Sequence, residues 1–147
     1  MRARRLGPGD ADFAAETLRV VKGAGEDPSF GPEQLRAFLA RPENLLIVAG
    51  EPGAPAGFLV AYALDRVDRA RRMACLYEIE VAESRRGRGV GRALVDELLA
   101  WCRRERVMKA WVVTSRSNTA AVRLYETAGA RPGAGDDDVV FVFEPIP

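Results

Sequence analysis

Residues 85–92, with the sequence RRGRGVGR, combine four arginines and three glycines in a chain whose formal net charge is only +1. They follow a predicted strand that ends near Val81 and precede a predicted helix that begins near Val90. The first turn of a helix presents unpaired backbone N–H groups to an anion, glycines let the backbone approach that anion closely, and arginines add charged donors. The segment therefore predicts a cradle for phosphate groups, with a solvated basic loop that caps the helix as the alternative.

The spacing of the glycines narrows the kind of cradle. A P-loop requires a lysine directly after its last glycine, and no lysine follows here. A dinucleotide fingerprint requires a third glycine where this chain has Arg92. The pattern that fits is R-x-x-G-x-G, formed by Arg86, Gly89 and Gly91.

This pattern resembles the acyl-coenzyme-A pyrophosphate loop of the GNAT superfamily of N-acetyltransferases. Residues 118–129, NTAAVRLYETAG, resemble the last helix of that family, which commonly has an asparagine near its start and Leu-Tyr-Glu-x-x-Gly near its end. With the order of predicted elements, the resemblance covers almost the whole chain. It implies an enzyme that moves an acetyl group from acetyl-CoA to a primary amine of a small molecule, by direct transfer in a ternary complex.

The resemblance also implies which residues bind acetyl-CoA. The backbone of Ile79 and Val81 would pair with the pantetheine arm, and Asn118 would contact that arm. Backbone amides of the glycine-arginine segment would hold the pyrophosphate, namely those of Arg86, Gly87, Arg88, Gly89, Val90, Gly91 and Arg92.

Two glutamates just before this segment are the candidate proton acceptors. A primary amine has a pKa of about 10 and must lose a proton before it attacks a thioester, and the chain has no histidine to accept that proton. Burial in the sheet and mutual repulsion would raise the pKa of Glu78 or Glu80 toward neutrality. Glu78 is the first choice because it is farther from the strand end. The alternative is that both carboxylates face solvent or pair with Arg71 or Arg72.

Strict alternation along the predicted strand 74–81 fixes the expected orientation of these glutamates. It places one set of side chains on one face, Leu76, Glu78 and Glu80, and another set on the opposite face, Tyr77, Ile79 and Val81.

Tyr125 is the candidate general acid, because a phenol can protonate the departing coenzyme-A thiolate. The family resemblance implies this role, and the alternative is a core aromatic at helical spacing. An acyl-cysteine intermediate on Cys75 or Cys102 is disfavoured, because no base partner is visible for either thiol.

Composition excludes several other classes of protein. The chain has 147 residues, which suits one domain over residues 1–147, and 48% hydrophobic residues argue against disorder. A net charge of +1 argues against a nucleic-acid partner, and two cysteines without a histidine argue against a disulfide framework or a metal site. The longest apolar run, residues 58–64, is too short for a bilayer span. We therefore expect a soluble cytoplasmic protein without a membrane partner; the resemblance adds the expectation of a possible homodimer.

Hydrophobic periodicity predicts a mixed α/β fold, and the resemblance implies a mostly antiparallel central sheet flanked by about four helices. Strands close together in sequence predict an antiparallel meander over residues 45–81. The expected strands are residues 2–7, 45–49, 57–64, 74–81, 111–114 and 139–143. The expected helices are residues 11–22, 32–41, 90–104 and 118–128.

The resemblance implies that the acceptor site lies between residues 23–42, the connector 65–72 and the acidic segment 136–138. Acidic residues there include Glu26, Asp27, Asp65 and Asp68. Two short sequences resemble the aminoglycoside 3-N-acetyltransferase branch of the family. They are Tyr-Glu-Ile at residues 77–79 and the acidic residue followed by Val-x-Phe near residues 138–141. Asn118 and the arginine-rich connector depart from that branch. The alternatives are a protein or peptide N-acetyltransferase, or an acetyl-CoA-binding module without turnover.

Overall fold

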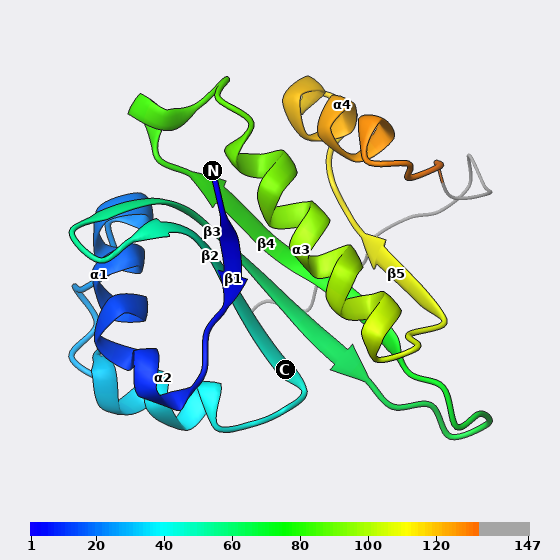
Figure 1. Ribbon diagram of the computed structural model, residues 1–147, viewed down its shortest axis with the longest axis horizontal. Coiled ribbons are helices and arrows are strands. Elements are labelled where there is room, and N and C mark those ends of the chain that lie inside the picture. The colour runs from blue at the N-terminus through cyan, green and yellow to red at the C-terminus, as the bar shows by residue number, and fades with distance from the viewer. Residues whose placement is uncertain (133–147) are drawn as a thin grey trace, which may run out of the picture.

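The structure is a computed structural model that describes residues 1–132. Its centre is a five-stranded sheet in the order β1-β2-β3-β4-β5 (Figure 1). The strands are β1 (Ala3–Arg5), β2 (Asn44–Glu51), β3 (Ala54–Leu64), β4 (Met73–Val81) and β5 (Lys109–Val112). Neighbours from β1 to β4 pair antiparallel, whereas β5 pairs parallel with β4. The predicted α/β class and the predicted meander are both confirmed.

Helices cover both faces of this sheet. They are α1 (Ala11–Lys22), α2 (Pro32–Leu39), α3 (Val90–Arg104) and α4 (Thr119–Thr127), with 3-10 turns at Pro8–Asp10 and Glu83–Arg85. α1 and α2 pack on one face and α3 on the other, while α4 lies beside the first turns of α3 (Figure 1). α1 ends at Gly23, whose φ of 73° is the left-handed conformation that favours glycine. Pro32 begins α2, because its fixed φ suits the first helical position.

Both faces of β2 are apolar because both are covered. Leu45, Ile47 and Ala49 are buried on the α3 side, and Leu46 and Val48 on the side of α1 and α2. The predicted apolar stripe of α3 fills the first of these layers with Leu94, Val95, Leu98, Trp101 and Cys102. A side chain of β3 or β4 can therefore be assigned to one face of the sheet by the layer in which it packs.

Some predicted elements differ from the structure or lie beyond its described part. β5 runs from Lys109 to Val112 rather than over residues 111–114, because it pairs in parallel with Met73 to Leu76 of β4. The predicted strand 139–143 and the acidic segment 136–138 lie outside the described residues. Within residues 1–132, no helix has both the length and the apolar character needed to cross a membrane.

Candidate active site

The turn between β4 and α3 carries the glycine-arginine segment. The N–H of Ala82 donates to the Ala56 carbonyl of β3 (2.9 Å), and the N–H of Arg85 donates to the Ala82 carbonyl (2.8 Å). Gly87 and Gly89 follow with φ angles of 71° and 77°, a backbone region that other residues enter at a cost. These two glycines turn the chain directly into the first turn of α3.

The backbone N–H groups from Gly87 to Arg92 form a consecutive unpaired run. None of them has an acceptor within the part of the chain that the structure describes; the next N–H, of Ala93, donates to the Gly89 carbonyl (3.0 Å). A helix leaves about four N–H groups unpaired at its N-terminus, and the glycine turn lengthens this run. Successive free N–H groups at a helix N-terminus bind phosphate oxygens, so the residues present fit a pyrophosphate.

Two arginine side chains of the segment, those of Arg86 and Arg92, form hydrogen bonds with other parts of the protein. Arg86 Nε donates to the Val81 carbonyl (3.3 Å). Arg92 donates to Asp96 and to the Thr127 carbonyl, both at 2.8 Å, which ties α3 to α4. An anion bound here would therefore depend mainly on backbone N–H groups.

A β-bulge in β4 corrects the predicted alternation of that strand. Val60 of β3 lies opposite Glu78, whereas the next residue, Ala61, lies opposite Leu76. Tyr77 is therefore an extra residue in β4, and an extra residue reverses the alternation of everything before it. The expectation that Leu76 shares a face with the glutamates was wrong, since Leu76 is buried on the α3 side.

The bulge also moves Tyr77 to the glutamates' side of the sheet. Glu78 and Glu80 lie opposite Val60 and Phe58, which pack on the side of α1 and α2. The Tyr77 ring contacts Tyr62 with a centroid separation of 5.7 Å, so it lies on this side too. It was wrongly expected beside Ile79 and Val81, which pack toward α3.

Glu78 forms an ion pair with Lys22 at the end of α1. The arginines considered as partners from the sequence are engaged elsewhere. Arg71 donates to the Arg106 carbonyl (3.1 Å), and Arg72 pairs with Glu105 (3.5 Å). Lys22 was missed by sequence reasoning, because nothing local marks a partner 56 residues away.

Glu80 is partly buried in the sheet beside Glu78. Burial raises the pKa of Glu80, and the neighbouring charge of Glu78 raises it further, against smaller lowering effects of Lys22 and Arg86. Within residues 1–132, no cation lies within ion-pair distance of its carboxylate. A carboxylate with a raised pKa and without a bound cation accepts a proton more readily than an ordinary carboxylate.

The edge of β4 beyond Leu76 is open among the described residues. β5 pairs with β4 only from Met73 to Leu76, and the chain after β5 runs away toward α4 (Figure 1). Because Ala82 directs its N–H to β3 and neighbouring strand residues alternate, Ile79 and Val81 direct theirs to the open edge. An extended ligand arm could add to β4 there as a further strand.

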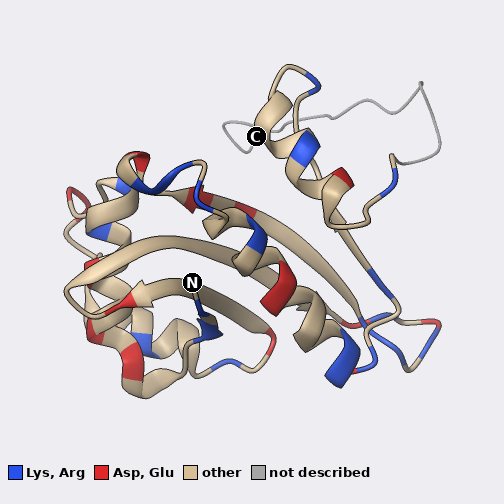
Figure 2. Cartoon of the chain, turned by 45° about the horizontal axis from the view of Figure 1, so that its top comes forward, with Lys and Arg blue, Asp and Glu red and all other residues tan. Residues whose placement is uncertain are grey.

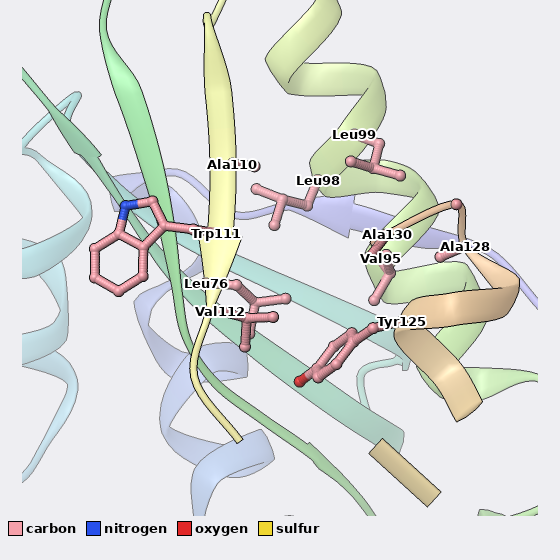
Figure 3. Close-up of a pocket in the computed structure, with 11 residues that line it drawn as sticks. Leu76, Val95, Leu98, Leu99, Ala110, Trp111, Val112, Tyr125, Ala128 and Ala130 are labelled. Carbon is pink, nitrogen blue, oxygen red and sulfur yellow. The ribbon is translucent and has the colours of Figure 1, made fainter. Parts of the chain in front are cut away.

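Tyr125 projects from α4 into an apolar pocket of about 240 Å³ between β5, α3 and α4. Figure 3 shows its ring reaching toward Leu76 and Val112, at the place where β4 and β5 separate. Burial raises the pKa of the Tyr125 hydroxyl, so it keeps its proton at neutral pH. The residue thus keeps the proton that its predicted role as general acid requires, beside the open strand edge.

Asn118 begins α4, and its side-chain oxygen accepts the N–H of Ala121 (3.2 Å). This hydrogen bond caps the helix, and contact with a cofactor arm stays a prediction. Burial raises the pKa of the thiols of Cys75 and Cys102, which disfavours a nucleophilic thiolate on either one. No cluster of acidic or cysteine side chains able to hold a metal ion occurs among residues 1–132.

Gly57 allows the strands of the site to approach α3, and its replacement tests this packing. A Cβ at Gly57 would lie 2.7 Å from the Glu80 carbonyl oxygen and 3.1 Å from Val90. We expect Gly57→Ala to lower the free energy of unfolding by about 2 kcal/mol, because backbone must move to accommodate the methyl group. Urea denaturation measures this, with Gly9→Ala as the matched control, since a Cβ at Gly9 meets nothing within 4 Å. Equal stability of the two variants would contradict the close approach.

An α/β domain with a run of free N–H groups between β4 and α3, an open strand edge and a partly buried carboxylate has features suited to a group-transfer enzyme. Residues 14–130 match the model of the Acetyltransferase (GNAT) family. The chain therefore belongs to the GNAT family of acetyltransferases.

Similar proteins agree with this placement. A mycothiol acetyltransferase of Geodermatophilus obscurus is 28% identical in an alignment 133 residues long, which covers 76% of this chain and 43% of that protein. This chain thus spans less than half the length of that curated relative. A crystal structure of an aminoglycoside acetyltransferase from an uncultured soil metagenomic sample superposes with a TM-score of 0.80 at 19% identity, covering 97% and 94% of the two chains. A ribosomal-protein-alanine N-acetyltransferase from Brucella melitensis biovar Abortus 2308 superposes with a TM-score of 0.72 at 22% identity, covering 97% and 100%. At these identities the two structures establish the shared fold.

Proposed function

We propose that this protein transfers the acetyl group of acetyl-CoA to a primary amine of a small molecule, by direct transfer in a ternary complex. The observation that carries the proposal is the unpaired N–H run from Gly87 to Arg92 beside the open edge of β4. Aminoglycoside and mycothiol acetyltransferases among the similar proteins support a small-molecule acceptor.

The cosubstrate supplies an acetyl thioester and an anionic pyrophosphate. N–H groups from Gly87 to Arg92 bind and orient the pyrophosphate at the N-terminus of α3. The backbone of Ile79 and Val81 holds the arm along β4, which brings the reactive end to the bulge at Tyr77. Positioning of this kind accounts for a large share of the rate enhancement in a two-substrate reaction.

Glu80 accepts the proton of the acceptor ammonium, directly or through a water molecule. Its raised pKa and the absence of an ion-pair partner in the described chain suit it to this role better than Glu78, the first choice from sequence. Glu78 is held by Lys22, and its negative charge helps to keep the pKa of Glu80 high. We therefore assign proton transfer to Glu80 and positioning to Glu78.

Tyr125 donates a proton to the departing thiolate, and its replacement is a direct test. We expect Tyr125→Phe to lower kcat about tenfold, because water must then protonate the departing thiolate in place of the phenol. The KM for acetyl-CoA should change little, since the cradle is untouched. Steady-state kinetics with a thiol reagent measures both constants, and an unchanged kcat would remove Tyr125 from the mechanism.

Thiol release from acetyl-CoA across a panel of amines tests the proposed function itself. The panel contains an aminoglycoside, a polyamine, an aromatic amine and a peptide with a free N-terminus. We expect release that depends on a small-molecule amine and an acetylated product detected by mass spectrometry. Acetyl-CoA binding by calorimetry without release on any amine would instead indicate a binding module without turnover. Release with the peptide alone would indicate a peptide N-acetyltransferase.

A further inference from the structure

A second pocket lies on the glutamates' side of the sheet, under α1 and α2. It has a volume of about 270 Å³, and we call it the aromatic pocket. Its walls include Phe30, Phe38, Tyr62 and Tyr77, and it is bordered by Lys22 and Glu78. Because Tyr77 and Glu78 belong to the bulge of β4, the pocket opens where the proposed acetyl transfer takes place.

The aromatic walls form one continuous surface. The ring of Tyr62 meets Phe38 edge-on at a centroid distance of 6.2 Å and Tyr77 at 5.7 Å. Phe30 closes the α1 side, where the Arg19 guanidinium lies 5.3 Å from its ring centroid. Tyr77 is 69% exposed, so its ring presents aromatic surface that a bound molecule can cover. Rings arranged in this way gain free energy by stacking on, and excluding water from, another apolar ring.

The charge at the pocket does not suit a polycation. Its lining residues include one cation and one anion, Lys22 and Glu78, and these neutralise each other. Asp27, one of the acidic residues expected near the acceptor site, accepts the N–H (2.7 Å) and the hydroxyl (2.6 Å) of Ser29 and does not line the pocket.

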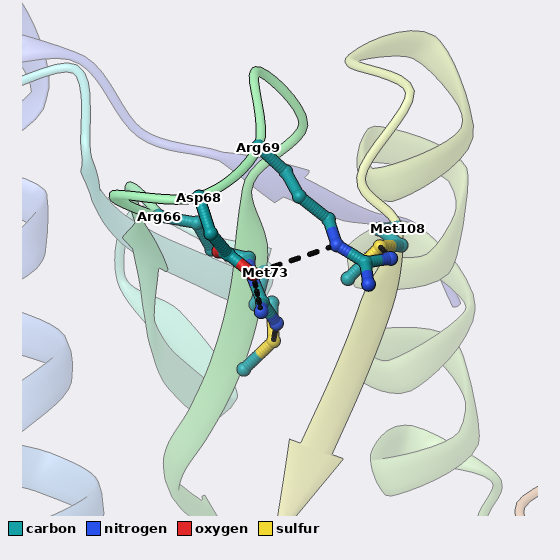
Figure 4. Close-up of polar contacts among 5 residues, drawn as sticks. All are labelled: Arg66, Asp68, Arg69, Met73 and Met108. Atoms are coloured by element: carbon teal, nitrogen blue, oxygen red, sulfur yellow. Dashed lines mark hydrogen bonds and ion pairs between the residues drawn. The ribbon is translucent and has the colours of Figure 1, made fainter.

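The connector between β3 and β4, residues 65–72, has more arginines than aspartates and is not part of the pocket lining. Asp68 accepts two hydrogen bonds from Arg66, at 2.8 and 2.7 Å, and pairs with Arg69 (3.6 Å). Figure 4 shows both arginines folded back from the connector, toward Met73 and Met108. Figure 2 shows basic residues gathered at this end of the molecule, around the connector and the last turn of α3.

We infer that the acceptor is a primary amine carried on a small aromatic or otherwise apolar body, which occupies the aromatic pocket with its nitrogen directed to the bulge of β4. This inference rests on the proposed acetyl transfer. The pocket volume of about 270 Å³ lies just below the usual range of ligand sites, about 300 to 1,000 Å³. An aromatic ring on a short aminoalkyl chain fits such a site, whereas a polycation of several sugar rings is too large for it and would find no net negative charge there.

A comparison of three amines as acetyl acceptors tests this inference. Initial rates of thiol release are measured with 2-phenylethylamine, spermidine and kanamycin at saturating acetyl-CoA. We expect kcat/KM for 2-phenylethylamine to exceed the other two by at least about tenfold. A kcat/KM for spermidine or kanamycin equal to or above that for 2-phenylethylamine would overturn the inference and leave the proposed function standing. Absence of release from every amine, with acetyl-CoA bound, would overturn the proposed function and the inference together.

Two variants assign the preference to the pocket. Phe38→Ala should raise the KM for 2-phenylethylamine about tenfold and leave the KM for acetyl-CoA unchanged. Tyr77→Ala should also raise the KM for 2-phenylethylamine. Because the Tyr77 side chain is exposed, its removal should have little effect on folding. Val20→Ala, on the exposed side of α1, is the control and should change neither constant. A KM for 2-phenylethylamine that is unaltered in both aromatic variants would place the amine elsewhere.

Discussion

Gly89→Asp is expected to weaken acetyl-CoA binding at least about a hundredfold, as measured by calorimetry. The new carboxylate would lie at the N-terminus of α3, among the free N–H groups of Gly87 to Arg92. It would accept those hydrogen bonds itself and repel the negative charge of a pyrophosphate. Aspartate at a φ of 77° carries some backbone strain, so thermal unfolding of the variant is measured beside its affinity.

Gly89→Asn separates charge from backbone strain in this experiment. Gly89 has a φ of 77°, and asparagine enters that region more easily than most residues. It has nearly the shape of aspartate without the charge, so its effect should be at most about tenfold. Equal losses in the two variants would mean that conformation, rather than anion binding, is what Gly89 provides. Unchanged affinity in Gly89→Asp would refute the cradle.

Glu80→Gln is expected to lower kcat about a hundred- to a thousandfold near neutral pH, the loss typical of a missing general base. The amide has nearly the same shape as the carboxyl group, but it cannot accept the proton of an ammonium ion. Glu78→Gln is the matched control on the same strand and face, and we expect a smaller loss. It removes the partner of Lys22 and the charge that raises the pKa of Glu80.

The pH dependence of kcat/KM gives a second signature of Glu80. Burial and Glu78 raise the pKa of Glu80, and only its deprotonated form accepts a proton. The rate should therefore fall as pH decreases through this raised pKa. Glu80→Gln should lose the fall in rate that is centred on the pKa of Glu80. Its low residual rate should instead increase steadily with pH, because the fraction of unprotonated amine increases. A wild-type acidic limb retained in Glu80→Gln would assign the proton acceptor to another group.

The strand, turn and helix around Gly89 could be predicted from sequence because the signals are local. A change from period-two to helical periodicity, with glycines between, predicts both the turn and the free N–H groups that follow from it. The structure has α3 beginning at Val90, as the pattern indicates. Gly23 and Pro32 mark helix ends by the same kind of local physical cause.

The orientation and partners of β4 residues could not be predicted in the same way. A bulge adds one residue without any change in residue type, so strict alternation misplaced Leu76 and Tyr77. The ion pair of Glu78 joins residues 56 positions apart, and only the packing of α1 on the sheet brings Lys22 there. The aromatic pocket likewise collects rings from four separate segments. Sequence therefore indicates the chemistry of Glu80 but not what distinguishes it from Glu78.

An NMR titration of the ¹⁵N-labelled protein tests the pyrophosphate cradle most directly. Acetyl-CoA is added, and the backbone N–H signals of residues 87–92 are followed together with those of Ile79 and Val81. We predict that this run of signals shifts together, with the N–H resonances moving downfield as they gain charged acceptors. Inorganic pyrophosphate alone should shift the run at residues 87–92 and leave Ile79 and Val81 unaffected. Saturable binding of acetyl-CoA with the signals of residues 87–92 unmoved would contradict the cradle and the proposed function that depends on it.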